Sequence, residues 1–183
     1  GLHGFLWGEG DGSLACWDAD ARWLVLLVQA NDVRDLRGKV KFPRAEVVYC
    51  GDRLGATGYL AANGGHGRAI IGGTATAGYS GTATAGDRGT ATAGDRGTAT
   101  AGYRGTATAG DRGTATAGDS GTATAGDSGT ATAGDSGTLV IFWWDDSAGR
   151  SRVVVGSVGE GGIEPNIPYR VVNGELRRAD QKS

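Results

Sequence analysis

An eight-residue unit, repeated eight times without a gap, constrains this chain more than any other feature. The octad Gly-Thr-Ala-Thr-Ala-Gly-x-x runs over residues 73–136, with Asp or Tyr at its seventh position and Arg or Ser at its eighth. Tandem repetition of so short a unit is typical of solenoids, in which a unit buries its apolar side only by stacking on its neighbours. The sequence therefore predicts a stacked array between two stretches of ordinary globular sequence.

The Thr-Ala-Thr-Ala segment of each octad predicts a short β-strand. Thr is β-branched and favours strands, and successive strand residues point to opposite faces, so one face presents two Thr and the other two Ala. The Gly-x-x-Gly that follows can turn the chain, because Gly accepts positive φ and Asp or Ser caps a turn locally. An eight-residue loop is too short to enclose its own side chains. Two octads are therefore expected to form one flattened 16-residue coil with Ala facing Ala, which gives about four coils.

This geometry predicts two flat grids of Thr side chains. Neighbouring coils would lie about 4.8 Å apart, and Thr residues at i and i+2 would lie about 6.8 Å apart. The grids also have a purely structural interpretation, because Thr ladders stabilise stacked strands whatever lies outside them. The sixteen side chains concerned are Thr74, Thr76, Thr82, Thr84, Thr90, Thr92, Thr98, Thr100, Thr106, Thr108, Thr114, Thr116, Thr122, Thr124, Thr130 and Thr132.

The overall prediction is a mainly β chain with three parts. Residues 1–68 are expected to form a small α/β N-terminal cap, residues 69–137 the octapeptide-repeat β-solenoid, and residues 138–183 a β-hairpin C-terminal cap. Caps are expected because the ends of a solenoid expose unpaired strand edges.

Within the N-terminal cap, residues 23–28 are expected to form a buried strand and residues 47–50 a second one. Residues 53–62 are expected to form a short helix. Directly after the cap, residues 69–71 are expected to form the first solenoid strand, with bulkier side chains than the octads. Cys50 stands where the octad pattern would place an inward Ala, which predicts a buried, inert thiol.

The C-terminal cap is expected to begin as a ninth octad, residues 137–144, with large apolar residues in place of Ala. The pair Trp143-Trp144 is expected to join the cap core. Residues 170–176 predict a hairpin, because their Asn-Gly dipeptide suits a type I′ turn. The basic tail, Arg177, Arg178 and Lys182, is expected to fray.

Several functional classes are disfavoured. No run of about 18 apolar residues is present, so no membrane span is expected. The net charge of −2 argues against nucleic-acid binding by bulk attraction. The corner Asp residues lack the nonapeptide pattern of Ca²⁺-binding β-rolls, so neither a metal nor a cofactor is expected. His3 has no identifiable catalytic partner, and the protein is expected not to be an enzyme. The sequence contains no signal-like segment, which favours a cytoplasmic compartment, whereas the trimmed start at Gly1 leaves a removed signal peptide as the alternative.

Read in another frame, the unit is Ala-Gly-Asp-Arg-Gly-Thr-Ala-Thr, or Ala-Gly-Tyr-Arg-Gly-Thr-Ala-Thr at residues 101–108. It resembles the octapeptide of bacterial ice nucleation proteins, Ala-Gly-Tyr-Gly-Ser-Thr-x-Thr, over the central third of the chain. The resemblance implies a solenoid of 16-residue coils whose Thr-x-Thr rows, the sixteen Thr above, order water. Tyr79 and Tyr103 match the family's Tyr, which forms a ladder between coils. Three octads separate these two, so a two-octad coil places them on opposite sides, and the continuous ladder is absent.

The resulting expectation is a non-enzymatic protein whose Thr rows bind ice or ordered water. A Thr methyl can pack against a water cage while its hydroxyl hydrogen-bonds to it. Four coils span only about 20 Å, which is too small a patch to nucleate ice well alone. The alternative is a structural module that forms a homodimer through a flat solenoid face, or spaces its two caps, and has no ice activity.

Overall fold

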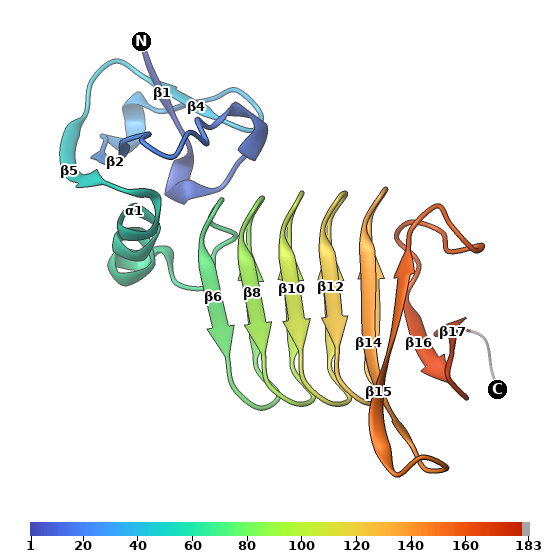
Figure 1. Ribbon diagram of the computed structural model, residues 1–183. Coiled ribbons are helices and arrows are strands. Elements are labelled where there is room, and N and C mark those ends of the chain that lie inside the picture. Colours follow the sequence, from blue (N-terminus) through green and yellow to red (C-terminus); the bar gives the residue numbers. More distant parts are fainter. Residues whose placement is uncertain (181–183) are drawn as a thin grey trace.

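The computed structural model describes residues 1–180 and has three parts in sequence order: an N-terminal region, a central solenoid and a C-terminal cap (Figure 1). Most of the regular structure is β, with one short α-helix in the N-terminal region. Among the described residues, no helix combines the length and the apolarity that crossing a bilayer would require.

Each octad forms one four-residue strand over its Thr-Ala-Thr-Ala segment, as its alternation predicts. The eight strands are β6 (Thr74–Ala77), β7 (Thr82–Ala85), β8 (Thr90–Ala93), β9 (Thr98–Ala101), β10 (Thr106–Ala109), β11 (Thr114–Ala117), β12 (Thr122–Ala125) and β13 (Thr130–Ala133).

The strands alternate between two parallel sheets, so two octads make one coil of 16 residues. One sheet has the order β15-β14-β12-β10-β8-β6 and the other β17-β16-β13-β11-β9-β7. Residues 16 positions apart stand side by side, so Thr106 lies between Thr90 and Thr122 without a register shift. The predicted solenoid of about four coils is confirmed.

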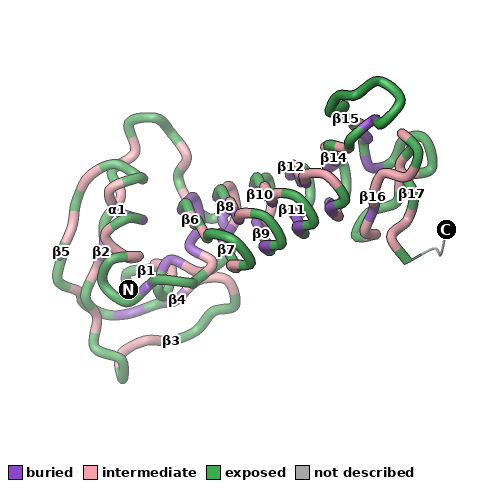
Figure 2. Tube along the Cα trace, turned by 90° about the horizontal axis from the view of Figure 1, so that it is seen from below, coloured by how far each residue is buried: buried purple, intermediate pink, exposed green. Residues whose placement is uncertain are grey.

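The solenoid core consists of Ala side chains from the two sheets. Ala91, Ala99 and Ala107 are fully buried, and Ala at the equivalent places of later coils is buried to the same degree. Buried residues therefore follow the interior of the coil stack (Figure 2). The two sheets can pack against each other over so thin a core only because Ala side chains are small. The core widens at the ninth octad, where Leu139 and Ile141 replace two Ala and are fully buried.

The tight corners between strands explain why the octad has glycines at fixed positions, and they give the residues between the glycines an unusual backbone. A Cβ on Gly113 would lie 2.8 Å from Ala109 Cβ and 2.9 Å from the carbonyl oxygen of Gly110, so close approach of the backbone requires glycine there. The eighth octad position, in contrast, adopts a left-handed backbone with φ between 53° and 57° although no glycine occupies it. Arg or Ser in this region carries a local conformational cost that the surrounding hydrogen bonds must offset.

The N-terminal region combines two small sheets and a helix. A three-stranded sheet has the order β1-β4-β3, and β2 pairs with β5. The elements are β1 (Leu2–Gly4), β2 (Trp23–Leu27), β3 (Arg34–Asp35), β4 (Val40–Phe42), β5 (Glu46–Gly51), α1 (Arg53–Leu60), the 3₁₀ turns Leu6–Gly8, Gly12–Leu14 and Ala30–Asp32, and the π-turn Ala61–Gly65.

Three details of this region differ from the sequence-based expectations. Of β2, only Val25 is buried, because its sheet has two strands and α1 packs beside it without enclosing it. Residues 69–71 form no strand; the carbonyl of Ile70 accepts hydrogen bonds from the N–H groups of Gly73 and Gly86, so the chain turns there into a corner. The Cys50 thiol is exposed, because β5 belongs to the same thin sheet and not to the solenoid.

The C-terminal cap continues both solenoid sheets with four strands, of which the first is parallel to its solenoid neighbour and the other three pair in antiparallel fashion. Its elements are β14 (Thr138–Asp145), β15 (Arg150–Ser157), β16 (Tyr169–Val172) and β17 (Glu175–Arg178). As predicted, β14 is a ninth solenoid strand that pairs in parallel with β12. The predicted hairpin joins β16 to β17, and its type I′ turn is confirmed by positive φ at Asn173 (51°) and Gly174 (81°).

Two expectations for this cap were wrong. Trp144 is 53% exposed and Trp143 half-buried, because β14 extends past the solenoid corner and has no second layer over its outer side there. Arg177 and Arg178 do not fray but belong to β17, where Arg178 pairs with Glu164 at 2.7 Å. Lys182 lies outside the described residues.

Candidate functional site

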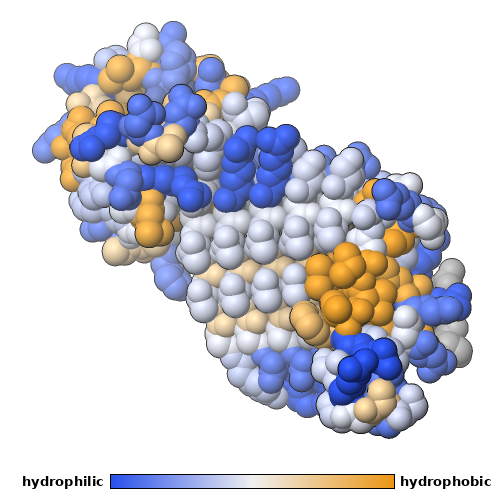
Figure 3. All heavy atoms as spheres, viewed as in Figure 1, coloured by the Kyte–Doolittle hydropathy of each residue, from blue (hydrophilic) through white to orange (hydrophobic). Residues whose placement is uncertain are grey.

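The sixteen Thr of the octads form two flat outer surfaces. The first Thr face is the outer side of β6, β8, β10 and β12, and the second Thr face is the outer side of β7, β9, β11 and β13. In-register parallel pairing aligns equal positions of neighbouring coils, so each face carries two rows of four Thr. Rows of near-neutral residues cross the middle of the molecule in the space-filling view (Figure 3).

None of these sixteen side chains is buried. The first Thr of a pair is exposed in six of the eight octads, whereas the second is half-buried in all octads but the first, where Thr76 is exposed. Hydroxyl and methyl groups in ordered rows are therefore accessible to solvent on both sides of a thin body. All sixteen positions predicted from the octad therefore lie on the outer surfaces of the two sheets.

Hydrogen bonds at the corners link each coil to the next and hold the grids in register. The Oδ1 of Asp95 accepts from the N–H of Asp111 at 3.1 Å, and the Oδ1 of Asp111 accepts from the N–H of Asp127 at 2.9 Å. On the opposite side, Asp119 accepts from the N–H of Asp135 at 2.9 Å. The corner carboxylates therefore have a structural role that the sequence reasoning missed, although the 16-residue spacing of the Asp residues signalled it.

A second set of corner bonds runs in the reverse direction. The N–H of the left-handed residue donates to the carbonyl of the seventh residue of the following coil, as from Arg96 to Asp111 and from Arg112 to Asp127, both at 2.8 Å. With the Asp bonds, this satisfies backbone groups that a tight corner would otherwise leave unpaired. The faces are consequently held by hydrogen bonds along their edges as well as between their strands.

An apolar patch extends the first Thr face at its C-terminal end. Val140 and Phe142 of β14 stand opposite Val155 and Val153 of β15, and Trp144 follows on the same side. The exposed fractions of Phe142, Trp144, Val153 and Val155 are 43%, 53%, 49% and 59%. Figure 3 shows a hydrophobic area bordering the Thr rows at this end. The sequence analysis did not predict this surface, because it placed Trp144 in the cap core.

The two corner Tyr residues lie on opposite sides of the solenoid, as the octad count predicts. Tyr79 follows β6 of one sheet, and Tyr103 follows β9 of the other. Each meets a guanidinium: the Cζ of Arg96 is 5.8 Å from the ring centre of Tyr79, and the Cζ of Arg104 is 5.1 Å from that of Tyr103. The two rings therefore do not form a ladder between coils.

The N-terminal region contains a hollow of about 330 Å³ beside His3. Cys16 and Arg22 also line it, but most of the lining is apolar, including Trp23 and Leu60. The partly desolvated His3 has a lowered pKa, to which the positive charges of Lys39, Lys41 and the N-terminus also contribute. Within residues 1–180, no three His, Cys, Asp or Glu side chains gather in an arrangement that could hold a metal ion.

Comparison with known proteins finds similarity in one stretch. The chain is 48% identical over 64 residues to an ice nucleation protein of Pseudomonas syringae, 46% over 65 residues to one of Xanthomonas campestris pv. translucens, and 40% over 62 residues to ice nucleation protein InaU of Pantoea ananas. These stretches are 34%, 34% and 33% of this chain but only 6%, 4% and 6% of the three relatives.

No family model matches the chain, and the comparison with solved structures found no match. The stretch of 64 residues has the length of the octad array, and the structure gives that array the coil spacing and paired Thr rows described above. The central third of the chain is therefore a β-solenoid whose octapeptide repeat is similar to the repeat of bacterial ice nucleation proteins.

Proposed function

We propose that this chain is a non-enzymatic protein that binds ice, or ordered water, through its Thr faces. The observation that supports this most directly is that all eight Thr-x-Thr pairs lie in register on the outer sides of two flat sheets. The similarity of the repeat to proteins named ice nucleation proteins also supports the proposal, although this chain spans only a few per cent of their length.

The physical basis is a rigid surface that offers two kinds of contact. Each Thr supplies a methyl group and a hydroxyl that both donates and accepts hydrogen bonds. Because corner bonds and strand pairing fix the side chains in rows, little conformational entropy remains to be lost on binding. Spacings of about 4.8 Å across the strands and about 6.8 Å along them lie near oxygen repeats of the ice lattice.

The size of the faces favours adsorption to existing ice over nucleation of new ice. Four coils cover about 20 Å along the solenoid axis, so a single molecule would order only a small cluster of water. We therefore propose that the isolated chain shapes and slows growing crystals and is a weak nucleator. The relatives are far longer proteins, and the matched stretch is only a small part of each.

The test is thermal hysteresis and crystal shape at micromolar protein, with one variant for each face. Thr90→Lys with Thr106→Lys changes exposed positions of the first face, and Thr98→Lys with Thr114→Lys changes the equivalent positions of the second face. A long, charged side chain removes flatness without burying a charge. Loss of activity in one double variant identifies the face used.

Matched controls separate ice binding from folding and from charge. Replacing Ser120 and Ser136, which are exposed at corners outside both faces, by Lys adds the same charge. These variants are expected to keep the wild-type activity. If wild-type protein leaves ice growth unchanged, or if the corner variants lose as much activity as the face variants, the proposal fails.

A second candidate is a self-association module, which the apolar patch on β14 and β15 supports. Within the described chain, β15 ends its sheet with β14 as its strand partner on one side, so its other edge offers unpaired backbone groups. A second copy could pair along this edge in antiparallel fashion, which would bring Val153 of each copy beside Val155 of the other. This is a different surface from the flat solenoid face first considered for a homodimer.

Sedimentation equilibrium of the full chain tests this candidate. Val153→Lys with Val155→Lys should convert a dimer to a monomer, because a charged edge opposes strand pairing. Leu24→Lys with Leu27→Lys, at exposed positions of β2, adds equal charge elsewhere and should leave the mass unchanged. A monomeric wild-type protein would rule this candidate out.

A further inference from the structure

One side of the solenoid carries a column of corners that faces the N-terminal region. The left-handed residues of this column are Arg88, Arg104, Ser120 and Ser136, which we call the Arg88 column. The opposite side has Ser80, Arg96, Arg112 and Ser128, which we call the Arg96 column. Both columns hold two Arg in successive coils, and the Arg88 column lies under a segment of the N-terminal region.

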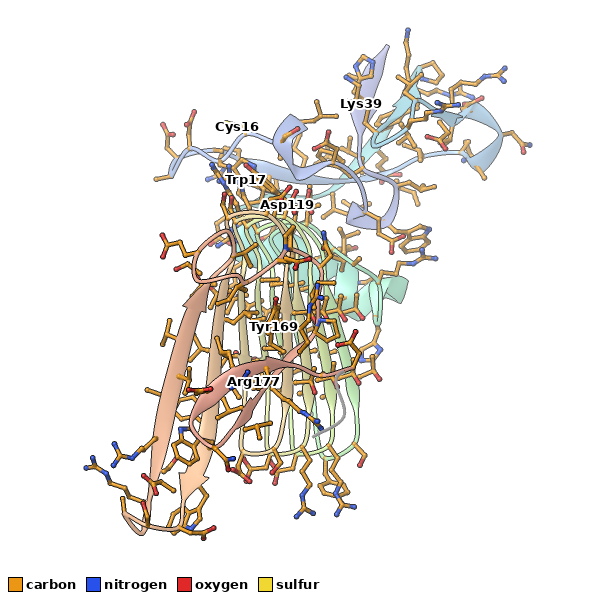
Figure 4. All side chains as sticks on the ribbon, turned by 90° about the vertical axis from the view of Figure 1, so that its right-hand side faces the viewer. Cys16, Trp17, Lys39, Asp119, Tyr169 and Arg177 are labelled. Atoms are coloured by element: carbon orange, nitrogen blue, oxygen red, sulfur yellow. The ribbon has the colours of Figure 1, made fainter. Side chains whose placement is uncertain are left out.

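That segment carries Trp17, which stands over the corner ends of the solenoid strands (Figure 4). The Cζ of Arg88 lies 4.6 Å from the ring centre of Trp17, and the Cζ of Arg53 lies 5.9 Å from it. The ring is fixed in turn by a hydrogen bond from its Nε1 to the carbonyl of Gly12 at 2.7 Å and by edge-on contact with Trp23 at 5.6 Å. Two guanidinium groups are therefore held beside one indole.

The segment is anchored to the same corner. The N–H of Gly12 donates to Oδ2 of Asp87 at 2.9 Å, while Oδ1 of Asp87 accepts from the N–H of Tyr103 at 2.9 Å. Both oxygens of this carboxylate are thus engaged by backbone groups. Asp87 ties the N-terminal region to the coils and is not an ion-pair partner of the adjacent Arg88.

The Arg88 side chain contacts the Trp17 ring but donates no hydrogen bond within the described residues. Its Nε is buried and has no hydrogen-bond partner. Within the described residues, Arg53, Arg88 and Arg104 form no ion pair, and Arg53 donates only to the carbonyl of Gly72 at 3.1 Å. Buried polar atoms in folded proteins nearly always have a hydrogen-bond partner. The unpaired guanidinium therefore indicates that an acceptor from outside the chain binds here.

The three guanidinium groups line one open hollow of about 580 Å³, together with Trp17 and Trp23. Two carboxylates, Asp18 and Asp52, also line it. Asp52 accepts from the N–H of Gly55 at 2.7 Å as the N-cap of α1, and Asp18 accepts from the Cys16 thiol at 3.4 Å. Three positive charges thus face two carboxylates, and the fork of a guanidinium suits bidentate contact with an oxyanion.

We propose that this hollow, between the Trp17 segment and the Arg88 column, binds the phosphate group of a soluble or membrane-borne phosphate ester. The indole of Trp17 positions the guanidinium groups of Arg53 and Arg88, and the phosphate oxygens take the free N–H donors of Arg88 and Arg104. Because the hollow is open to solvent, the group esterified to the phosphate extends outward. The site lies at a corner, off both Thr faces, and does not depend on the proposed ice binding.

The repeat itself supplies variants that leave the corner backbone intact. Arg88→Ser with Arg104→Ser installs the residue that later coils of the same column already carry at the same left-handed φ. Arg96→Ser with Arg112→Ser removes the same charge from the opposite column and serves as the matched control. The full chain is titrated with glucose 6-phosphate by calorimetry at constant ionic strength, and its binding to phosphatidylcholine vesicles with and without phosphatidic acid is measured by sedimentation.

Wild-type protein is expected to bind at least one of these probes saturably, and the Arg88-column variant to bind it roughly tenfold or more weakly, as loss of charged hydrogen bonds implies. The Arg96-column variant should bind like wild type. Glucose 6-phosphate binding would identify a soluble ester as sufficient, and binding to phosphatidic acid vesicles alone a membrane-borne one. Absence of binding to both probes, or equal weakening in the two variants, would overturn the proposal.

Discussion

At the scale of single residues, the corners contain eight of the twelve non-glycine residues with positive φ in the described chain. Each octad must reverse direction within Gly-x-x-Gly, and the structure places its eighth residue at positive φ although it is Arg or Ser. Sequence reasoning located these corners correctly but assigned the unusual backbone to the glycines. Most glycines of the octad are instead required by space, since an added Cβ would meet the backbone of the neighbouring coil; Gly78, with no atom within 4 Å of such a Cβ, is an exception.

Ser120→Gly should therefore stabilise the protein. Ser120 has φ of 54°, a left-handed conformation that is unfavourable for Ser but not for Gly. The free energy of unfolding is therefore expected to rise by about 0.5–1 kcal/mol. Urea denaturation measures the change. Ser151→Gly, in the extended backbone of β15, is the control and should lower stability. A loss of stability at Ser120 comparable to that at Ser151 would contradict this view of the corners.

Gly113→Ala should have the opposite effect, although it adds only a methyl group. Its Cβ would lie 2.8 Å from Ala109 Cβ and 3.0 Å from the carbonyl oxygen of Gly97 in the preceding coil. Crowding of this kind typically costs about 1–3 kcal/mol. Gly58→Ala in α1 is the control, because no atom lies within 4 Å of its added Cβ and helix propensity favours Ala. Equal effects of the two changes in thermal unfolding would refute the close-packing argument.

At the scale of secondary-structure elements, the β14–β15 hairpin is tied by one buried carboxylate. Asp145 accepts hydrogen bonds from the Ser147 hydroxyl at 2.6 Å and from the N–H groups of Ser147 and Ala148 at 3.0 Å and 3.1 Å, and it pairs with Arg152. The Ser147 hydrogen bond, with smaller contributions from Ala148 and Arg152, holds the pKa of Asp145 below its ordinary value of 3.8.

The sign of this shift fixes a pH dependence. A carboxyl group whose pKa is lower in the folded state stabilises the fold above its unfolded pKa, and this contribution is lost as pH falls through the folded pKa. Asp145→Asn should therefore lower the melting temperature at pH 6, and the difference from wild type should shrink toward pH 3. Asp146→Asn, at the exposed neighbouring position, is the control. A difference that stays constant from pH 6 to pH 3 would show that the charge of Asp145 is not responsible.

At this scale the sequence was informative where a pattern repeats and poor where it does not. Strict Thr-Ala alternation predicted every solenoid strand, and Asn173-Gly174 predicted a turn that the structure contains. Burial outside the array was misjudged: Cys50, Trp144 and most of β2 are more exposed than expected. Burial depends on whether a second layer covers a strand, and local sequence does not encode that for a two-stranded sheet or an extended hairpin.

At the scale of the whole molecule, the coil stack behaves as a one-dimensional array, in which a coil contacts only its neighbours. Inserting a second copy of residues 97–112 would add one coil and lengthen both Thr faces by about 4.8 Å. We expect the longer protein to remain folded and to show greater thermal hysteresis at equal molar concentration. Deleting the same residues should reduce it, and activity independent of coil number would place the active surface outside the array.

The residues of the Thr faces could be predicted from the sequence, but the surfaces that lie beside them could not. All sixteen Thr were identified from the octad, whereas the apolar patch beside the first Thr face and the cluster of Arg53, Arg88 and Arg104 around Trp17 were not. Both features arise where non-repeated segments meet the array. Their positions follow from tertiary contacts such as the Gly12–Asp87 hydrogen bond, which no periodicity reveals.

The most direct measurement is partition of the protein into slowly growing ice. Fluorescently labelled wild-type chain is frozen progressively beside a variant in which exposed Thr of both faces, Thr90, Thr98, Thr106 and Thr114, are replaced by Lys. Our account predicts that the ice takes up the wild-type chain while the folded variant is left in the liquid. Exclusion of wild-type protein from the ice, or equal uptake of both proteins, would contradict it.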